Sequence, residues 1–531
     1  MSVKLAAQLF SHSVSAAMQT AIDTKELSTN TCSATAEFIK IVDNAFDALN
    51  SRNLQDKKPC KRALSEANNE AFAALNKMAE AMKSIKKITN QAGLMLGLIY
   101  GWSSPAIPRL NGSIEPENNP LPSPITLSQE SWIASLLPLG CIFSAFITGL
   151  ICDKIGRKRT LLTAAIPCIV GFTLCGFPKN VYYFYFGRFF SGLGCGIIAV
   201  VMPIFVGEIS EKHNRGLLCC VYTVAISIGN LLFFGLTPYC GIYALSIFGL
   251  IVSILFLITF TIFIPESPYY LLMKGELNKA RKSLLKLRCN NTKIVEIELP
   301  IIKKNIDETL SIKRNFFDFF KDKALSRGLM IALGLAAFQQ LSGINIIFFY
   351  MQSIFEESQT GLSSDLCTVF VGLVQLVCSV VTSITIDKFG RKILLLVSAI
   401  GMLITLTVLS IYYHLKERNF DVQNISSLPI WFINLYVMTY TLGFGPIVFG
   451  VAGEIFPLYA KSIASTLTTS TGLISTFFIT SLFPYLKESI GIGYTFTILA
   501  VICGFAGCFV YVKVPETKGK TLEEIEVMLK I

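Results

Sequence analysis

Two groups of charged residues occur twice along the chain with matched spacing, and the chemistry open to them is ion pairing. Residues 153–158, Asp-Lys-Ile-Gly-Arg-Lys, return as residues 387–392, Asp-Lys-Phe-Gly-Arg-Lys. A Gly-Glu-Ile triplet at residues 207–209 returns at 453–455, and a basic residue stands seven positions after each glutamate, at Arg215 and Lys461. Acids and bases that recur together favour salt-bridge networks.

Three amide side chains lie close together inside one long apolar run. They are Gln339, Gln340 and Asn345. A polar amide in apolar surroundings costs free energy unless it faces a cavity or bonds to a neighbouring helix. On one continuous helix Gln339 and Asn345 come close around the circumference, with Gln340 beside them. The cluster can therefore bind a neutral polar ligand, and packing between helices is the alternative.

The residues that catalysis or metal binding would need are not arranged for either. The three histidines, His12, His213 and His414, fit no ligand or triad spacing. Gly519-Lys520-Thr521 lacks the more distant glycine of a phosphate-binding loop. The fifteen cysteines show no ligand spacing, and many lie in apolar runs, where a thiol acts as a small apolar side chain. We expect no enzymatic activity, no cofactor and no metal.

The recurring groups indicate an internal duplication, since Pro265-Glu266-Ser267 also returns as Pro515-Glu516-Thr517. With 52% hydrophobic and 15% charged residues, a soluble chain of this length would lack the polar surface to cover itself. Its apolar runs of about 20 residues are long enough to cross a bilayer as helices. The expected spans are 89–108, 131–151, 160–177, 183–207, 217–236, 241–263, 328–350, 366–386, 392–413, 428–453, 463–484 and 491–512.

The expected fold class is an all-α membrane protein with twelve transmembrane helices in two pseudo-symmetric halves of six. The N-terminal half is placed at residues 87–264, the C-terminal half at 328–513 and a tail at 514–531. The linker at 265–327 is strongly basic, and Ala280, Leu284 and Leu287 recur in it at helical spacing. We therefore expect an amphipathic helix within residues 275–287.

Lysine and arginine concentrate in alternate loops, which predicts that both termini and the linker are cytoplasmic. By the same count the sequons at Asn111 and Asn424 face outward and can be glycosylated, whereas the sequon at Asn290 stays inside. The net charge of +11 belongs to these scattered loops, so we expect no nucleic-acid binding by the membrane part.

Residues 1–86 do not follow the membrane pattern. The runs KLAAQLFSHSVSAA, ATAEFIKIVDNAFDALNSR and KRALSEANNE resemble a segment of P-element-like, THAP-type transposases, although none of that family's catalytic acids can be identified. We interpret this segment as a cytoplasmic fusion remnant or a gene-model artefact. A regulatory tail is the alternative.

Residues 88–531 resemble a sugar porter of the major facilitator superfamily, similar to insect facilitated trehalose transporter-like proteins and the facilitative glucose transporters. The motifs that carry this resemblance are Gly101-Trp102-Ser103-Ser104-Pro105, Ser131-Trp132-Ile133-Ala134-Ser135, both Asp-Lys runs, Gly187-Arg188-Phe189, Pro265-Glu266-Ser267-Pro268, Gln339-Gln340-Leu341-Ser342-Gly343-Ile344-Asn345, Gly453-Glu454-Ile455-Phe456-Pro457 and Pro515-Glu516-Thr517-Lys518-Gly519. The resemblance implies a monomer in the cell membrane that carries a hexose or trehalose.

The same resemblance implies which residues bind the sugar. The matching positions are Gln339, Gln340, Asn345, Gln375, Phe449 and Thr223. Several places depart from the family's usual residues, among them Phe449 in place of a tryptophan, Thr223 in place of a glutamine, and Gly472-Leu473 in place of an asparagine–tryptophan pair. These departures leave the identity of the sugar open.

We expect the recurring charges to latch the inner gate of a carrier that alternates between two faces. The proposed gating residues are Asp153, Arg157, Arg188, Glu208 and Arg215 in the first half and Asp387, Arg391, Glu454 and Lys461 in the second. The hypothesis is that this layer holds when the site faces outward and breaks when it opens inward. A role in membrane orientation alone is the alternative, but it would not explain the matched acids.

Facilitated uniport by alternating access is the favoured function. Proton-coupled relatives carry an aspartate in the first span, whereas residues 94–107 contain no carboxylate and place Ser103 near that position. A proton-coupled symporter and a non-transporting sugar sensor remain the alternatives.

Overall fold

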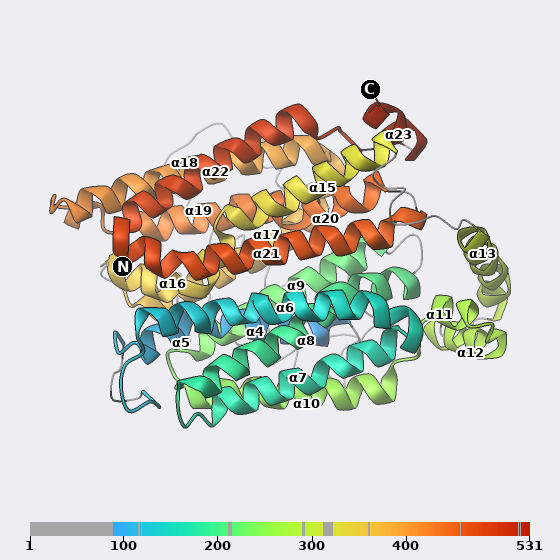
Figure 1. Cartoon of the computed structure of the whole chain (residues 1–531), viewed down its shortest axis with the longest axis horizontal. Coiled ribbons are helices and arrows are strands. Elements are labelled where there is room, and N and C mark those ends of the chain that lie inside the picture. The colour runs from blue at the N-terminus through green and yellow to red at the C-terminus, as the bar shows by residue number, and fades with distance from the viewer. Residues whose placement is uncertain are drawn as a thin grey trace, which may run out of the picture. The chain divides into compact units, whose positions relative to one another are not determined.

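The computed structural model describes residues 89–531, apart from gaps at 115–116, 118, 211–214, 289–291, 312–321, 359–361, 457, 519, 521 and 531. The expectations for residues 1–86 and for Asn290 therefore lie outside the described residues. Within them the first half contains α4 (Thr89–Gly101), α5 (Ser103–Leu110), α6 (Leu127–Ile155), α7 (Arg157–Gly176), α8 (Val181–Ile209), α9 (Arg215–Leu236) and α10 (Ile242–Phe263), drawn in blue to green in Figure 1.

The second half repeats this series of helices. It contains α15 (Lys323–Leu341), α16 (Ile344–Ser358), α17 (Ser364–Phe389), α18 (Arg391–Glu417), α19 (Leu428–Leu442), α20 (Phe444–Ile455), α21 (Leu458–Ile490) and α22 (Ile492–Lys513), in yellow to red in Figure 1. Each predicted span is found as one helix or as two short helices in sequence. A short 3-10 helix, η2 (Gln423–Ile425), lies in the loop before α19.

The helices have the length and surface of membrane spans. In the described part of the chain ten helical segments are long and apolar enough to cross a membrane, and the apolar part of α9, Val221–Leu236, is somewhat shorter. Large apolar side chains such as Phe146, Ile251 and Ile400 are about half exposed on the outside of the bundle. Such exposure would be unfavourable in water and suits contact with lipid. The all-α membrane fold with duplicated halves is confirmed.

Three spans are broken, which the sequence reasoning did not predict. The breaks fall at Trp102 between α4 and α5, at Ser342–Gly343 between α15 and α16, and at Gly443 between α19 and α20. Gly343 has a φ of 93°, and a Cβ there would meet the Leu499 side chain. A break frees backbone carbonyl groups, which at membrane depth must find other partners. Two of these breaks meet at the amide cluster described below.

The two halves carry the same turn between their second and third spans. Gly156 joins α6 to α7 with a φ of 100°, and Gly390 joins α17 to α18 with a φ of 88°. This left-handed region is open to glycine and strained for other residues. We call the end of the bundle that carries these two turns the motif end, and the other end the opposite end.

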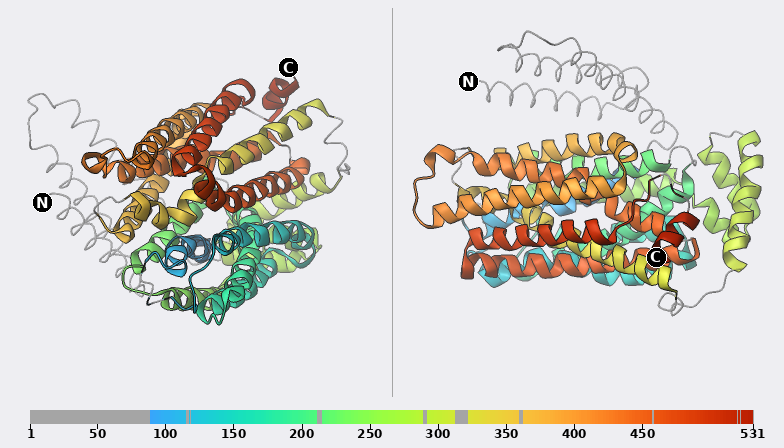
Figure 2. Two further views of the ribbon diagram at one scale, coloured as in Figure 1. Left: turned by 60° about the vertical axis from the view of Figure 1, so that its left-hand side comes forward. Right: turned by 90° about the horizontal axis from the view of Figure 1, so that it is seen from above.

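Short helices of the linker and the tail lie at the motif end. They are α11 (Pro268–Met273), α12 (Leu277–Leu287), α13 (Thr292–Ser311) and the C-terminal α23 (Leu522–Lys530), and Figure 2 shows them beside the ends of the long helices. The predicted linker helix is confirmed as α12, with Ala280, Leu284 and Leu287 buried. Arg288 anchors the linker, because it pairs with Glu298 and donates to the Ile209 carbonyl at the end of α8.

The main contacts between the halves in the described part of the chain are α6 with α21, α9 with α17, and α5 with α16. Within the first half, α4 and α9 approach so closely that a Cβ at Gly97 would lie 2.1 Å from the Ile226 carbonyl oxygen. Small residues permit such contacts between membrane helices. In the first half α4 and α9 are therefore packed closely against each other.

Candidate substrate site and gates

Gln340, Asn345 and Thr476 form a chain of hydrogen bonds inside the second half. Asn345 Nδ2 donates to Gln340 Oε1 at 2.5 Å and lies 3.3 Å from Thr476 Oγ1 of α21. Gln340 Nε2 in turn lies 3.4 Å from Gln339 Oε1. The amides are half-buried at Gln340 and Asn345, so a ligand that enters between the helices can exchange hydrogen bonds with them.

Gln339 joins this chain through its Oε1 and bonds with its Nε2 to the start of α20, at another break. Its Nε2 donates to the carbonyl oxygens of Phe444 at 2.6 Å and Gly445 at 3.0 Å, and the side chain is 2% exposed. The helix that was expected to carry Gln339 and Asn345 on one side is broken at Ser342–Gly343, and the two are linked through Gln340, which bonds to both. Gln339 therefore supports the break between α19 and α20 in this conformation.

Gln375 forms a hydrogen bond across the boundary between the halves. It accepts from Asn230 Nδ2 of α9 at 3.3 Å. Asn230 is 3% exposed, and its Oδ1 has no hydrogen-bond partner among the described residues. The sequence reasoning missed Asn230. The available signal was a lone amide in the otherwise apolar second part of the fifth span.

The remaining two predicted binding residues lie apart from the amide chain. Thr223 is exposed on α9, seven positions before Asn230, which places the two on the same side of that helix. Phe449 is 47% exposed on α20, beyond the break that Gln339 supports. Both side chains are thus exposed in this conformation.

At the motif end of the first half, Arg157 joins three helices. Its Nη2 lies 2.9 Å from Glu208 Oε1, and its Nη1 lies 3.0 Å from Asp153 Oδ1. Glu208 also accepts a hydrogen bond from the Ser267 hydroxyl in the linker. Arg157 stacks above the Tyr270 ring at 5.6 Å, which adds a cation–π contact.

The second half repeats this arrangement. Arg391 Nη2 lies 3.0 Å from Glu454 Oε1, and Thr517 Oγ1 donates to Glu454 Oε2 at 2.5 Å. Ser267 and Thr517, which were not among the predicted gating residues, therefore hold the two glutamates in equivalent ways. The side chains of Arg215, Asp387 and Lys461 lie outside the described residues.

Glu266 and Glu516 complete the two networks. Glu266 bonds to the N-terminal turn of α7, and Glu516 bonds to the N-terminal turn of α18. Glu266 Oε1 accepts from the Lys158 backbone N–H at 2.9 Å, and Glu516 accepts from those of Arg391 and Lys392 at 2.9 and 3.1 Å. A carboxylate at a helix N-terminus accepts hydrogen bonds from otherwise unpaired N–H groups, and its negative charge interacts favourably with the positive end of the helix dipole. Partial burial tends to raise the pKa of the Glu516 carboxyl, but hydrogen bonds from four backbone N–H groups outweigh it and lower that pKa.

Arg188 does not belong to the motif end, contrary to expectation. It lies 20 positions before Glu208 on α8, about 30 Å away along the helix axis. Its guanidinium donates to the Ile99 carbonyl at 3.0 Å and to Ser103 Oγ at 2.5 Å, and stacks above Trp102 at 5.1 Å. Arg188 therefore supports the break between α4 and α5. The error arose because α8 enters the membrane at the opposite end.

Polar contacts join the two halves near the opposite end of the bundle. Ser104 Oγ accepts from the Gln352 N–H at 3.1 Å, Arg109 Nη2 lies 3.9 Å from Asp365 Oδ1, and Ser131 Oγ donates to the Ser481 carbonyl at 2.7 Å. At the motif end the ion pairs between described residues each join helices of one half. In this conformation the halves are thus bridged at the opposite end.

Both outward sequons lie at the opposite end of the bundle. Asn424 is exposed in η2, whereas Asn111 is half-buried at the end of α5 and its Nδ2 lies 3.5 Å from Glu130 Oε2. Asn424 is thus the more accessible of the two for glycosylation.

The comparisons with known proteins agree with this architecture. The family model described as "Sugar (and other) transporter" matches residues 63–529, and a model described as "TNP-like, GTP-binding insertion domain" matches residues 1–63. The chain is 33% identical over 436 residues to a facilitated trehalose transporter Tret1 of Bombyx mori, covering 82% of this chain and 84% of the relative. It is 34% identical over 440 residues to the Tret1 of Polypedilum vanderplanki, covering 82% and 86%.

Two solved structures share the fold. The xylose transporter XylE from E. coli in a partially occluded inward-open conformation aligns with a TM-score of 0.68 and 25% identity, covering 83% of this chain and all of that one. Its inward-open conformation aligns with the same TM-score at 24% identity, covering 84% and 99%.

Proposed function

Because the chain belongs to the sugar transporter family, we propose that it carries a neutral sugar, a hexose or trehalose, across the cell membrane by facilitated uniport. The similarity to relatives named as facilitated trehalose transporters supports a sugar as the substrate. The observation that carries the proposal is the uncharged chain of Gln340, Asn345 and Thr476 deep in the membrane helices. Neutral amides and hydroxyls match sugar hydroxyls without the desolvation cost of a charge.

We propose that the sugar is held between this chain and the pair formed by Asn230 and Gln375. Gln375 lies in the second half and Asn230 in the first, so a ligand placed there would contact both. Phe449 offers an apolar face of the kind that a sugar ring prefers. A site shared by two halves suits alternating access, in which one half rocks against the other.

The motif end is proposed to be cytoplasmic, with the site open toward it in this conformation. The bridging contacts at the opposite end support this reading, as do the basic residues around the motif end. In the outward-facing state those contacts would break and the motif ends of the halves would close together. The networks of Arg157 and Arg391 are proposed to shape the surfaces that meet then.

Uniport is favoured over proton coupling, because α4 and α5 contain no carboxylate that could load a proton at the first span. We also propose that the protein acts as a monomer, that it catalyses no reaction and that the membrane part binds no nucleic acid.

The test is uptake of labelled trehalose and glucose into proteoliposomes without any ion gradient. Uniport predicts saturable uptake that stops when the internal and external concentrations are equal, with or without an imposed proton gradient. Accumulation driven by a proton gradient would instead establish a symporter. Sugar binding without flux would establish a sensor.

A further inference from the structure

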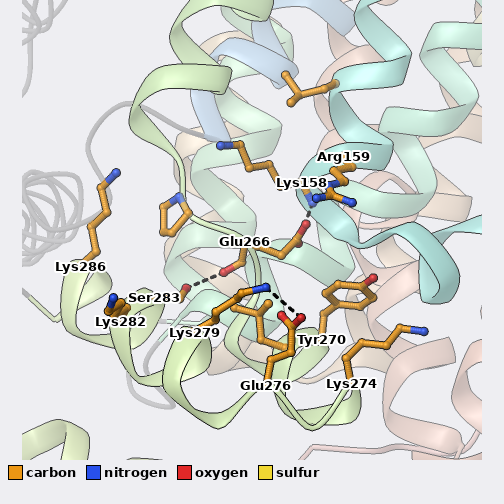
Figure 3. A pocket seen from close by; sticks show the side chains of 13 residues that line it. Lys158, Arg159, Glu266, Tyr270, Lys274, Glu276, Lys279, Lys282, Ser283 and Lys286 are labelled. Carbon is orange, nitrogen blue, oxygen red and sulfur yellow. Dashed lines mark hydrogen bonds and ion pairs between the residues drawn. The ribbon is translucent and has the colours of Figure 1, made fainter.

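A cavity of about 790 Å³ lies between the start of α7 and the first linker helices, away from the amide chain. Its walls come from the first turn of α7, from the connection that follows α10, and from α11 and α12. Figure 3 shows the basic side chains that line it, arranged around Glu266.

The lining of this cavity carries far more positive than negative charge. The basic residues are Lys158, Arg159, Lys274, Lys279, Lys282 and Lys286, and the acidic residues are Glu266 and Glu276. Both carboxylates are already engaged. Glu266 accepts from the backbone N–H groups of Lys158 and Ser267, and Glu276 pairs with Lys279 at 2.9 Å.

Only Lys279 of these cations pairs with an acidic side chain among the described residues; Lys158 donates to a backbone carbonyl, and Lys274 lies over the Tyr270 ring. No hydrogen bond, ion pair or ring contact in the described part of the chain engages the charged ends of Arg159, Lys282 and Lys286. Lys279, Lys282 and Lys286 recur at intervals of three and four, so they share one face of α12, while Leu284 and Leu287 bury the other face. Like charges gathered on one wall repel one another, and an anion between them would relieve that repulsion.

The cavity borders the lipid-facing surface of the bundle. Lys158 Nζ donates to the Thr261 carbonyl at 2.8 Å, in the last turn of α10. Ile258, Ile262 and Phe263 are 49%, 62% and 47% exposed on the same part of α10. A ligand with a charged head in the cavity could therefore lay an apolar tail along this helix.

We propose that the cavity binds a multiply phosphorylated anion, supplied by the headgroup of an anionic phospholipid in the adjoining leaflet. Phosphate oxygens accept charge-assisted hydrogen bonds from several ammonium and guanidinium groups at once. Juxtamembrane clusters of basic residues attract anionic lipids at about 1 kcal/mol for each basic residue. The exposed apolar end of α10 favours a lipid over a soluble phosphate.

A bound headgroup would join the linker to the first half. Lys158 and Arg159 belong to α7, whereas Lys282 and Lys286 belong to α12, so an anion between them bridges the two. Ser283 Oγ already donates to the Glu266 carbonyl at 2.5 Å, next to Ser267, which bonds to Glu208. The ligand would thus stabilise the network around Arg157 from the linker side.

The experiment measures binding to the purified full-length protein by thermal shift and by fluorescence titration with a short-chain phosphatidylinositol bisphosphate. The parallel ligands are the free inositol trisphosphate headgroup and a short-chain phosphatidylcholine. The test variant is Lys282→Gln with Lys286→Gln. The matched control is Lys303→Gln with Lys513→Gln, which removes the same charge from exposed positions at the motif end outside the cavity.

The inference predicts that the bisphosphate lipid raises the melting temperature and that the test variant weakens its binding about tenfold, while the control variant binds as the unmodified protein does. Phosphatidylcholine should not bind at this site. Equal binding of the free headgroup would assign the site to a soluble phosphate, with the same cavity chemistry. Equal loss in both variants, or no binding of either phosphorylated ligand, would overturn the inference.

Discussion

Asn230 of the first half donates a hydrogen bond to Gln375 of the second half, with 3.3 Å between Nδ2 and Oε1. This contact crosses between α9 and α17 within the membrane, and the Asn230 Oδ1 remains without a partner in the described part of the chain. A buried polar atom without a partner costs about 1–3 kcal/mol. A sugar hydroxyl that donates to Asn230 Oδ1 would remove this cost when the ligand binds.

Replacing Asn230→Ala should lower the apparent affinity for sugar about two- to tenfold, because one hydrogen bond contributes about 0.5–1.5 kcal/mol. Concentration-dependent uptake in proteoliposomes measures it. The matched control is Ser227→Ala on the same helix, whose hydroxyl bonds, among the described residues, only to the Thr223 carbonyl of α9 itself. Equal affinity in the two variants would remove Asn230 from the site.

Gln339 and Gln340 are neighbours with different roles, and alanine variants should separate them. Gln339→Ala removes the side-chain donor shared by the Phe444 and Gly445 carbonyls and should cost about 0.5–1.5 kcal/mol of stability, seen as a lower melting temperature. Gln340→Ala should leave the melting temperature nearly unchanged and weaken sugar transport. The opposite assignment of the two effects would contradict the geometry.

Arg157→Ala should reduce the transport rate about tenfold while the protein still reaches the membrane. A shift of about 1.4 kcal/mol between the two conformations is enough for a tenfold change in their ratio. Arg281→Ala removes an exposed pair with Glu296 at 3.3 Å and serves as the control, with little effect on transport. Transport that survives both substitutions would show that the Arg157 network only fixes orientation.

Glu516 should make stability depend on pH in the acidic range. Its pKa is lowered in the folded protein, so its ionised form stabilises the fold at neutral pH, and this contribution is lost as the pH falls below the ordinary glutamate value of about 4.3. The difference in melting temperature between the unmodified protein and Glu516→Gln should therefore shrink between pH 6 and pH 3.5, both rough limits around that value. Glu488→Gln, at an exposed position of α21, should show no such trend.

The sequence predicted the helices well because membrane spans are set by the length of apolar runs. The duplication was visible in the Asp-Lys runs and in the Pro-Glu motifs. The breaks at Trp102, Gly343 and Gly443 were not predicted, because each apolar run is long enough to be taken as one continuous helix. Those breaks decide where the Gln339 side chain points, so its hydrogen bonds to the Phe444 and Gly445 carbonyls could not be predicted from the sequence.

The charged networks at the motif end were predicted in part for a related reason. Residue types at the ends of spans indicated that Arg157, Glu208, Arg391 and Glu454 form ion pairs, and the structure pairs Arg157 with Glu208 and Arg391 with Glu454. Arg188 lies near the start of α8 and Glu208 near its end, so the two side chains are at opposite ends of the bundle. The prediction that both belong to one network did not take the direction of the helix into account. The contacts at the opposite end, such as Arg109 with Asp365, join residues far apart in sequence without a motif.

The central claim is that one half moves against the other, and a cross-link at the opposite end tests it most directly. Ser131 Oγ and Ser481 Oγ lie 3.4 Å apart on α6 and α21, so cysteines at both positions should form a disulfide. Under oxidation the Ser131→Cys, Ser481→Cys double variant should lose sugar uptake, and reduction should restore it, while each single variant transports under both conditions. Undiminished uptake by fully cross-linked protein would contradict the account.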